Sequence, residues 1–524
     1  MQMLKNTSQL GKRSLRIVLL FICLYTLVIF LQGNDCSPSS IDSNYNSGKL
    51  ASAYCTFVNW SNSLMSSTSY RLRDPSISVQ EENVSTVLEN QTTIDRIVFG
   101  IGTVDASWAE RREYVKLWWK EGVTRGFVWT DKNLTSWEYG DPPFKVSEDT
   151  SQFIISHHYN KAALRISRIV VETFQLGLPD VDWFVMGDDD TLFFTENLVQ
   201  VLSKYDPKGM YYIGSHSEDT AQSVKHRYGM AYGGGGFAIS YPLAKALSET
   251  QDDCVKRYYW MFGSDERVKA CVAELGVPMT NEPGFHQMDL QGDISGYLAA
   301  HPVVPIVSLH HLDRWNPIFY GANSLEDLKR LMKVLPVDPV GLFQQSICYA
   351  EERKWSFTVA WGYVVEIYEG FVPPRELEMP TRTFTSWTYY TQETGDFTFD
   401  NREMGYFCDH PTRFFMVTAE SKGSGTKMVG MTSYERLVSE EGDSKVCMEK
   451  SAPLSTVKFV KVEKEPLSKK WYQNPLRQCC KVTDMDSEKI NIQVGACSES
   501  ESLVVGAKPV VQTALVKPRR FLGG

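Results

Sequence analysis

The stretch Val181-Asp-Trp-Phe-Val-Met-Gly-Asp-Asp-Asp190 decides the fold and the chemistry expected of this chain. Its apolar first part indicates a buried strand, and it ends in three consecutive aspartates. Neighbouring carboxylates repel one another, so stability alone is a poor reason for them. Alternate side chains of an extended segment share a face, and a hard divalent cation would relieve the repulsion. We therefore predict a metal held by Asp188 and Asp190; a solvated acidic loop before a helix near Thr195 is the alternative.

The segments before this stretch alternate between strand and helix character. Apolar runs at 96–103 and 126–130 indicate buried strands, while 107–121 and 161–174 carry apolar residues at helical spacing. Such an alternation predicts an open α/β sheet, in which ligands bind at the carboxyl ends of strands. We expect this domain to cover residues 95–335.

The residue pattern of the sequence changes beyond residue 336. Aromatic and β-branched residues alternate at 355–361 and 383–389. This pattern predicts a β-rich, cysteine-containing domain over 336–503, followed by a tail at 504–524. Trp355, Trp361 and Trp387 could stack on a glycan, although aromatic residues at strand spacing more often belong to a core.

The amino terminus has the pattern of a membrane anchor. A basic flank precedes a largely apolar run of about 15 residues, roughly 22 Å long as a helix. We expect a cytosolic tail at 1–16, a transmembrane signal anchor at 17–32 and a polar stem at 33–94. Basic residues before the anchor favour a cytosolic amino end, and the short span suits thin secretory membranes. A cleaved signal peptide is the alternative.

Two other features agree with a lumenal location. Ten cysteines lie outside the anchor, none in C-x-x-C spacing, and they favour an oxidising compartment. We predict a disulfide between Cys254 and Cys271 and further disulfides within the group from Cys408 to Cys497. The spacing of that group does not determine which of its cysteines are paired. The net charge of −9 gives no electrostatic reason to expect nucleic-acid binding. Glycosylation sequons begin at Asn59, Asn83, Asn90 and Asn133.

Several motifs together resemble a known family. The run Asp182-Trp-Phe-Val-Met-Gly-Asp-Asp-Asp-Thr191 resembles the D-x-D region of Fringe and its β-1,3-glycosyltransferase relatives. The resemblance extends over about 95–315 and is strongest to plant Fringe-like proteins. The other segments that resemble the family are Gly233-Gly-Gly-Gly-Phe-Ala-Ile-Ser240, Gly263-Ser-Asp-Glu-Arg267, Leu275-Gly-Val-Pro278 and Phe285-His286. The plant group also has segments similar to Ser308-Leu-His-His-Leu-Asp313 and Arg477-Gln-Cys-Cys480.

The resemblance implies a GT-A fold, Mn²⁺, a UDP-sugar donor and inversion at the anomeric carbon. It makes Asp265 the catalytic base, although an acid in the first turn of a helix also interacts well with the helix dipole. It assigns the metal to Asp188, Asp190 and a histidine. That histidine is His286 or His310, because Met288 stands where the family has its ligand. Donor contacts would come from Asp188, Asp189, Asp190, Gly234 and Gly235, with a flexible turn as the other interpretation of the glycines.

The sequence therefore predicts an inverting glycosyltransferase that moves a hexose or N-acetylhexosamine to a glycan or glycoprotein hydroxyl, with a β-1,3 link. It would be a single-pass type II Golgi membrane protein with a lumenal catalytic domain. A lectin-like Fringe-fold protein without turnover is one rival, favoured by Ser264 in place of a family acid. A metal-dependent hydrolase is a second. Sugar, acceptor, oligomeric state and the role of the terminal domain stay open.

Overall fold

The computed structural model describes residues 92–154, 161–320, 323–388, 396–405, 410–423, 428–437 and 454–497. All of them belong to one compact unit, 85–524. The predicted cytosolic tail, the anchor at 17–32, the stem up to residue 91 and the tail at 504–524 lie outside the described residues. Within the described ranges, no helix combines the length and the apolar character needed to cross a membrane.

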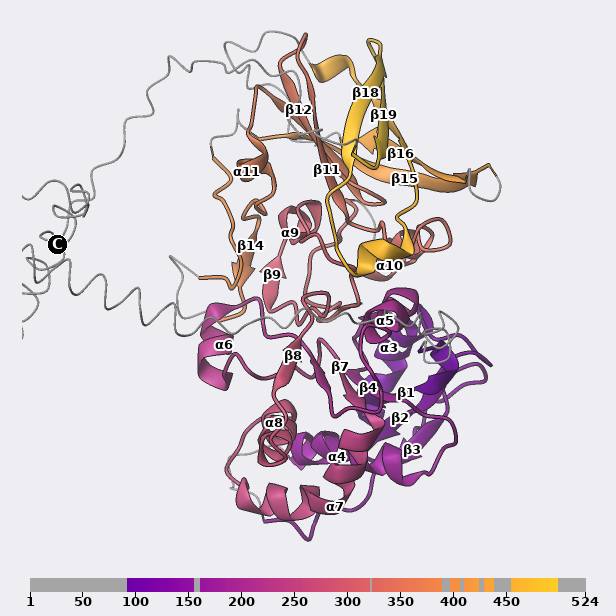
Figure 1. Cartoon of the computed structure of the whole chain (residues 1–524), viewed down its shortest axis with the longest axis vertical. Coiled ribbons are helices and arrows are strands. Elements are labelled where there is room, and N and C mark those ends of the chain that lie inside the picture. The colour runs from indigo at the N-terminus through magenta and orange to yellow at the C-terminus, as the bar shows by residue number, and fades with distance from the viewer. Residues whose placement is uncertain are drawn as a thin grey trace, which may run out of the picture. The chain divides into compact units, whose positions relative to one another are not determined.

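A seven-stranded sheet forms the first part of the described chain, in the order β3-β2-β1-β4-β7-β6-β8 (Figure 1). The strands β3, β2, β1 and β4 run parallel, whereas β7 runs antiparallel to both of its neighbours. β8 is parallel to β6. The bounds are β1 Ile97–Gly102, β2 Arg125–Thr130, β3 Phe144–Val146, β4 Trp183–Asp188, β6 Tyr212–Gly214, β7 Phe237–Ser240 and β8 Met279–Asn281.

Both faces of the central strands are covered, which explains their continuous apolar runs. Ile97, Phe99 and Ile101 of β1 lie in one core cluster, while Val98 lies in another, as the alternation of a strand requires. The first cluster includes residues of α3 (Asp105–Lys116) and α5 (Thr195–Leu202). The second includes α4 (Lys161–Gln175), α7 (Tyr241–Arg257) and α8 (Ser264–Glu274). The predicted open α/β sheet and its helices are thus confirmed, with boundaries shifted by a few residues.

A closed barrel forms most of the remaining chain, in the order β11-β12-β13-β15-β16-β17-β19-β18. It closes where β11 pairs with β18 at Ile347 and Cys479. Trp355 and Trp361 are buried, so these two belong to the core. The strands are β11 Gln345–Ala350, β12 Trp355–Ala360, β13 Val364–Glu369, β15 Thr412–Lys422, β16 Val429–Arg436, β17 Phe459–Lys464, β18 Cys479–Met485 and β19 Lys489–Gly495.

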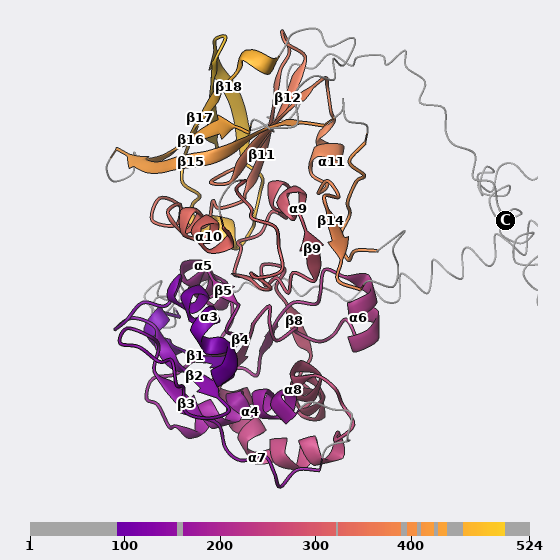
Figure 2. The same ribbon diagram turned by 180° about the vertical axis from the view of Figure 1, so that it is seen from behind.

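The run at 383–389, predicted to belong to the β-rich domain, departs from the barrel. Its strand β14 (Phe384–Ser386) pairs antiparallel with β9 (Leu290–Gly292), and both views show the two side by side (Figure 2). Alternation of residue types marks a strand, but it does not say which strand is the partner. The remaining elements are η1 Ile94–Arg96, β5 Leu192–Phe193, α6 Thr220–His226, α9 Ser295–Ala299, β10 Ser308–Leu309, α10 Ser324–Met332, α11 Pro374–Leu377, η4 Leu454–Thr456 and η5 Lys469–Tyr472.

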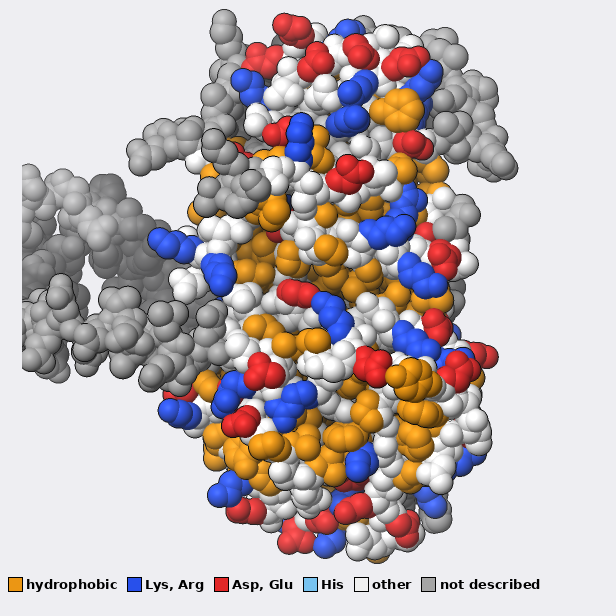
Figure 3. All heavy atoms as spheres, turned by 90° about the vertical axis from the view of Figure 1, so that its right-hand side faces the viewer, with side chains coloured by type: hydrophobic (Ala, Val, Ile, Leu, Met, Phe, Trp, Pro, Cys, Tyr) orange, Lys and Arg blue, Asp and Glu red, His pale blue; other side chains and the backbone are white. Residues whose placement is uncertain are grey.

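One face of the molecule is drawn in Figure 3. Hydrophobic side chains gather there over the sheet and at the level between sheet and barrel, while basic and acidic side chains are interspersed. One apolar cluster runs from the sheet through Phe319 and Phe343 into the barrel. Sheet and barrel therefore share a continuous core.

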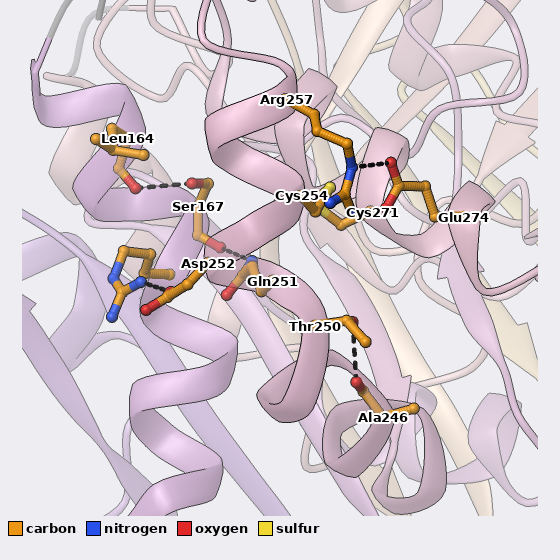
Figure 4. The surroundings of a disulfide bond; sticks show 11 residues. Leu164, Ser167, Ala246, Thr250, Gln251, Asp252, Cys254, Arg257, Cys271 and Glu274 are labelled. Atoms are coloured by element: carbon orange, nitrogen blue, oxygen red, sulfur yellow. Dashed lines mark hydrogen bonds and ion pairs between the residues drawn. A yellow bond between two sulfur atoms is a disulfide. The ribbon is translucent and has the colours of Figure 1, made fainter. Parts of the chain in front are cut away.

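Disulfides join elements in both parts. Cys254 of α7 is bonded to Cys271 of α8, as predicted (Figure 4). In the barrel, Cys479 is bonded to Cys497, but Cys480 is bonded to Cys348, which lies outside the predicted cysteine group. Cys408 falls outside the described residues.

Candidate functional site

The predicted acidic cluster lies where the strand order of the sheet reverses. β1 lies between β2 and β4 in the sheet. The connections that follow β1 and β4 therefore diverge in opposite directions, which leaves a crevice at the carboxyl ends of these two strands. Open α/β sheets bind ligands in this position. β4 ends at Asp188, and Thr103, directly after β1, donates a 2.5 Å hydrogen bond to Asp189.

The middle aspartate, Asp189, has its partners within the protein. One oxygen accepts hydrogen bonds from Thr103 and from Ser107 at 2.9 Å, and the other accepts from Arg111 at 2.8 Å. The residue is 3% exposed. Asp189 therefore fixes α3 to the end of β4. Both of its carboxylate oxygens already accept hydrogen bonds from the protein, so its predicted contact with the donor stays a prediction.

Asp188 and Asp190 converge on one nitrogen atom of His310. The Nε2 atom of His310 lies 3.2 Å from Oδ1 of Asp190 and 3.8 Å from Oδ2 of Asp188. Oδ1 of Asp190 is buried and makes no hydrogen bond of good geometry. An orphaned buried carboxylate oxygen facing an imidazole nitrogen is a donor set that suits a divalent cation.

Two neighbours hold the His310 ring in this orientation. Its Nδ1 atom lies 3.1 Å from the carbonyl oxygen of Gln287 and donates to it, which turns Nε2 toward the aspartates. A carbonyl bonded to the far nitrogen is a common arrangement for metal-ligating histidines. Gly234 packs directly against the ring, because a Cβ there would lie 2.1 Å from Cε1 of His310.

Electrostatics bind His310 and Asp190 to each other. Burial alone would lower the pKa of His310, but the carboxylates of Asp190 and Asp188 raise it to about 9. Burial opposes ionisation of Asp190, yet His310 and Arg111 hold the pKa of Asp190 well below its usual range. The pKa of Asp188 is raised by removal from solvent and by its neighbouring carboxylates. Without a metal, His310 is thus an imidazolium, and a bound cation would replace its proton.

The structure corrects the prediction that His286 is the third ligand. The Nδ1 atom of His286 lies 3.0 Å from Oε1 of Glu218, and its Nε2 atom lies 2.9 Å from Nε2 of His301. With both nitrogens occupied in a buried cluster, none is left for a metal near the aspartates. Within the described residues, the one group of three ligand side chains close enough to share an ion is Asp190, His310 and His311. His310, the alternative in the sequence, is therefore the better candidate.

The glycine run has a packing role that the sequence did not reveal. Gly234 makes room for His310, and a Cβ on Gly235 would lie 2.9 Å from the backbone nitrogen of Gln287. Gly235 also donates a 2.8 Å hydrogen bond to the side chain of Gln287. Contact between these glycines and a donor stays a prediction.

Asp265 lies in the first turn of α8, with Gly263 as the capping residue. Its carboxylate accepts hydrogen bonds from the backbone of Gly233 at 3.2 Å and of Glu266 at 3.0 Å. Burial nevertheless raises the pKa of Asp265, which favours proton uptake. Asp188 and Asp265 line the same small pocket, of about 20 Å³, which also contains Gly233. The predicted base and the predicted metal site are thus neighbours.

The disulfide between α7 and α8 helps to hold Asp265 in place. Figure 4 shows the Cys254–Cys271 bond beside a side-chain pair of Arg257 and Glu274, which join at 3.0 Å. Gln251 of α7 donates a 2.7 Å hydrogen bond to the backbone of Ser167 in α4. The helix that carries Asp265 is thereby tied to the helical layer of the sheet.

Sequence reasoning did not identify Arg111 or His311. Arg111 pairs with Asp189 and lies 3.4 Å from Asp190 and 3.1 Å from Asp313. The sequence around Arg111 does not identify it as a site residue, because the acids that it contacts lie 78 or more residues further along the chain. His311 does carry a signal, since it directly follows His310.

Parts of this chain are similar to known proteins. Residues 92–319 match the family described as Fringe-like, and residues 222–480 match a family described as a protein of unknown function, DUF604. A mouse (Mus musculus) protein named beta-1,3-glucosyltransferase is 30% identical over 134 residues, which are 25% of this chain. The match spans only 26% of the mouse protein's length.

Two solved structures also show a likeness. One is a glycosyltransferase involved in the glycosylation of the major capsid of PBCV-1, at 12% identity and a TM-score of 0.24, covering 44% of this chain and 97% of that one. The other is mouse xyloside xylosyltransferase 1, at 8% identity and a TM-score of 0.21, covering 38% and 85%. Scores this low carry no weight for the fold, whereas the match to the Fringe-like family does. Residues 92–319 of this chain are therefore similar to the Fringe-like family, and part of the chain is similar to a beta-1,3-glucosyltransferase.

Proposed function

We propose that this protein is an inverting, Mn²⁺-dependent glycosyltransferase that moves a hexose or N-acetylhexosamine from a UDP-sugar to a glycan or glycoprotein hydroxyl. The observation that carries the proposal is the convergence of Asp188, Asp190 and His310 at the carboxyl end of β4 in a Fringe-like domain. The name of the mouse relative favours a β-1,3 link and makes UDP-glucose the first donor to test.

Asp190 and His310 would hold the metal, with Asp188 or His311 beside them. The fit rests on the buried, unbonded Oδ1 atom of Asp190 and on the Nε2 atom of His310 that faces it. When bound, the cation would neutralise the donor diphosphate as a leaving group. Gln287 fixes the tautomer of His310, and Arg111 adds positive charge beside Asp190.

Asp265 would act as the base. An inverting transfer is a direct displacement, in which the acceptor hydroxyl loses its proton as it attacks the sugar. Asp265 shares a pocket with Asp188, and burial raises its pKa, which brings it closer to the range of a useful base. Its backbone hydrogen bonds with Gly233 and Glu266 hold the carboxylate in one orientation.

A glycan-binding protein without turnover is the second candidate function. Arg111 favours it, since a guanidinium 2.8 Å from Asp189 and 3.4 Å from Asp190 can balance these acids without a metal. A two-metal hydrolase has less support, because the described residues contain no second group of three metal-ligating side chains.

Calorimetry of UDP binding with and without Mn²⁺ tests the proposed metal site. We expect Mn²⁺ to strengthen UDP binding to the wild type, and Asp190→Ala and His310→Gln to abolish that effect. Asp253→Ala, at an exposed carboxylate of α7, is the matched control. If Asp190→Ala keeps full metal dependence, Asp190 is not a metal ligand and the buried acidic cluster only joins α3 to the end of β4.

Release of UDP from UDP-sugars distinguishes an enzyme from a binding protein. The enzyme releases UDP when Mn²⁺ and an acceptor are present. A protein that binds UDP with Mn²⁺ but releases none across a donor and acceptor screen would favour the second candidate.

We also propose that residues 17–32 anchor the chain in the Golgi membrane, with residues 1–16 cytosolic and the catalytic domain lumenal. Three disulfides among the described residues support an oxidising compartment. Protease treatment of sealed microsomes tests this topology, and digestion of the sheet domain without detergent would contradict it.

A further inference from the structure

A segment from outside the Fringe-like match lies against the candidate metal site. β14 (Phe384–Ser386) pairs with β9 in the register Phe384↔Gly292, Thr385↔Gln291 and Ser386↔Leu290. The next residue, Trp387, donates a 3.1 Å backbone hydrogen bond to Asp289. The Fringe-like match ends at residue 319, so Trp387 belongs only to the part matched by the DUF604 family.

Residues on both sides of Trp387 are fixed to a single buried carboxylate. Asp219, which is 1% exposed, accepts a 2.5 Å hydrogen bond from the hydroxyl of Ser386. It also accepts bonds from the backbone nitrogen and the hydroxyl of Thr388, each at 3.1 Å. Asp219 is at the same time the N-cap of α6. These bonds determine the position of the Trp387 backbone.

The indole of Trp387 stacks on the imidazole of His311. The ring centroids lie 4.1 Å apart and the planes differ by 10°. The ring of His311 also lies against that of His310, with the centroids 3.8 Å apart. The Nε2 atom of His311 lies 3.2 Å from Oδ1 of Asp289. Asp289 is also the residue whose backbone oxygen accepts the hydrogen bond from Trp387.

His311 adopts a backbone conformation that needs support. Its φ angle is 58°, in the left-handed region that is unfavourable for a residue with a side chain. Such conformations persist where surrounding contacts determine them, and they are frequent at functional sites. The His311 side chain contacts the Trp387 indole, the Asp289 carboxylate and the His310 ring, and of these the stack with Trp387 is the most closely parallel.

We propose that Trp387 is a positioning residue of the metal site. Its indole holds His311 in the left-handed conformation in which the ligand atoms of Asp190, His310 and His311 lie within 4.8 Å of one another. The segment Ser386–Thr388 therefore completes a site whose ligands all come from the Fringe-like domain. This inference rests on the proposed function, because it presumes that the cluster binds a metal.

Mn²⁺ affinity of the full-length protein with UDP present, measured by electron paramagnetic resonance, tests the inference. Changes around a metal ligand typically cost about 10- to 100-fold in affinity. We expect Trp387→Ala and Trp387→Leu to weaken Mn²⁺ binding by about tenfold. Trp387→Phe keeps a ring to stack and should weaken it by less than about threefold. Thr385→Ala, at an exposed position of β14, should leave the affinity unchanged.

The melting temperature separates positioning from folding. Lost Mn²⁺ affinity in the Leu variant, with a melting temperature like that of the Phe variant, supports the inference. Wild-type affinity in a folded Leu variant overturns it, whatever the Ala variant does. The Asp190→Ala variant distinguishes failure of the Trp387 inference from failure of the proposed function. If Asp190→Ala loses Mn²⁺ binding while Trp387→Leu keeps it, the metal site stands and only the role of Trp387 is wrong.

Discussion

The Nε2 atoms of His286 and His301 lie 2.9 Å apart, so one nitrogen must carry a proton and the other must not. Nδ1 of His301 lies 2.8 Å from the carbonyl oxygen of Pro302 and donates to it, so the neutral His301 ring accepts at Nε2. His286 then donates from Nε2 and accepts at Nδ1. Two groups face that Nδ1 atom, the hydroxyl of Tyr297 at 3.1 Å and the carboxyl of Glu218 at 3.0 Å; the hydroxyl can donate to it, and so can Glu218 when it is protonated.

The pKa shifts of this cluster follow the same logic. Burial raises the pKa of Glu218 to about 7 and lowers that of His286 to about 3. Burial also lowers the pKa of His301, with His286 adding to the effect. Folding thus moves protons off both histidines and places one on Glu218.

Replacing Glu218 by Gln should make stability more dependent on pH. Between pH 4.5 and 6.5, the ordinary pKa values of Glu and His, the unfolded cluster binds two protons and the folded one binds one. Wild-type stability from this cluster therefore rises with pH by about 1.4 kcal/mol per unit. Glu218→Gln binds no proton when folded, so its slope should be about twice as steep.

Within this window the contribution of Glu218 itself has the opposite sign to that of the two histidines. Its raised pKa contributes stability that is fully present below pH 4.5 and lost as the pH rises through about 7. The Gln variant lacks that loss. Urea unfolding across this range measures both slopes, with Glu376→Gln as an exposed control. Parallel curves for Glu218→Gln and wild type would mean that Glu218 is ionised in the folded protein.

Gly234→Ala should damage the metal site without unfolding the sheet. The new Cβ would lie 2.4 Å from both nitrogens of His310, so the ring must move. We expect Mn²⁺-dependent UDP binding to weaken by roughly 10- to 100-fold. Gly229→Ala is the control, because its nearest neighbour would be Lys269 at 4.0 Å. Unchanged binding in Gly234→Ala would exclude His310 as a ligand.

Asp265→Asn should reduce turnover while donor binding persists. The variant keeps the shape but cannot take a proton, so the rate should fall by roughly 10²–10⁴-fold. Glu266→Gln separates catalysis from helix capping. Glu266 pairs with His226 and accepts from the backbone of Gly263, so this variant should lose stability but retain turnover per folded molecule. Near-normal turnover in a folded Asp265→Asn protein would reject Asp265 as the base.

Much of the sheet domain could be predicted from the sequence because its signals are local. Apolar runs marked β1 and β4, since a parallel strand covered on both faces needs no polar residue. The pairing of β14 could not be predicted, because an alternating pattern is satisfied by any sheet edge. Residue types likewise indicated strands at 355–360 but not the closure of a barrel.

The acidic residues of the candidate site could be identified from the sequence, but the sequence could not decide which histidine lies beside them. Asp188 and Asp190 stand together in sequence, at the end of a recognisable strand. The choice between His286 and His310 depends on which ring faces the aspartates, and that follows from Gly234, Gln287 and the fold around them. Motif spacing pointed to His286, whose nitrogens are engaged by Glu218 and His301.

The seam of the barrel determines when this protein can finish folding. Its first strand pairs with β18 at Ile347 and Cys479, and Cys348 is bonded to Cys480, 132 residues later. During synthesis the sheet domain emerges first. One edge of β11 then stays unpaired until β18, near the end of the described residues, has been synthesised. Open strand edges invite association between chains. The yield of soluble recombinant protein should therefore depend on how quickly the host oxidises this one cysteine pair.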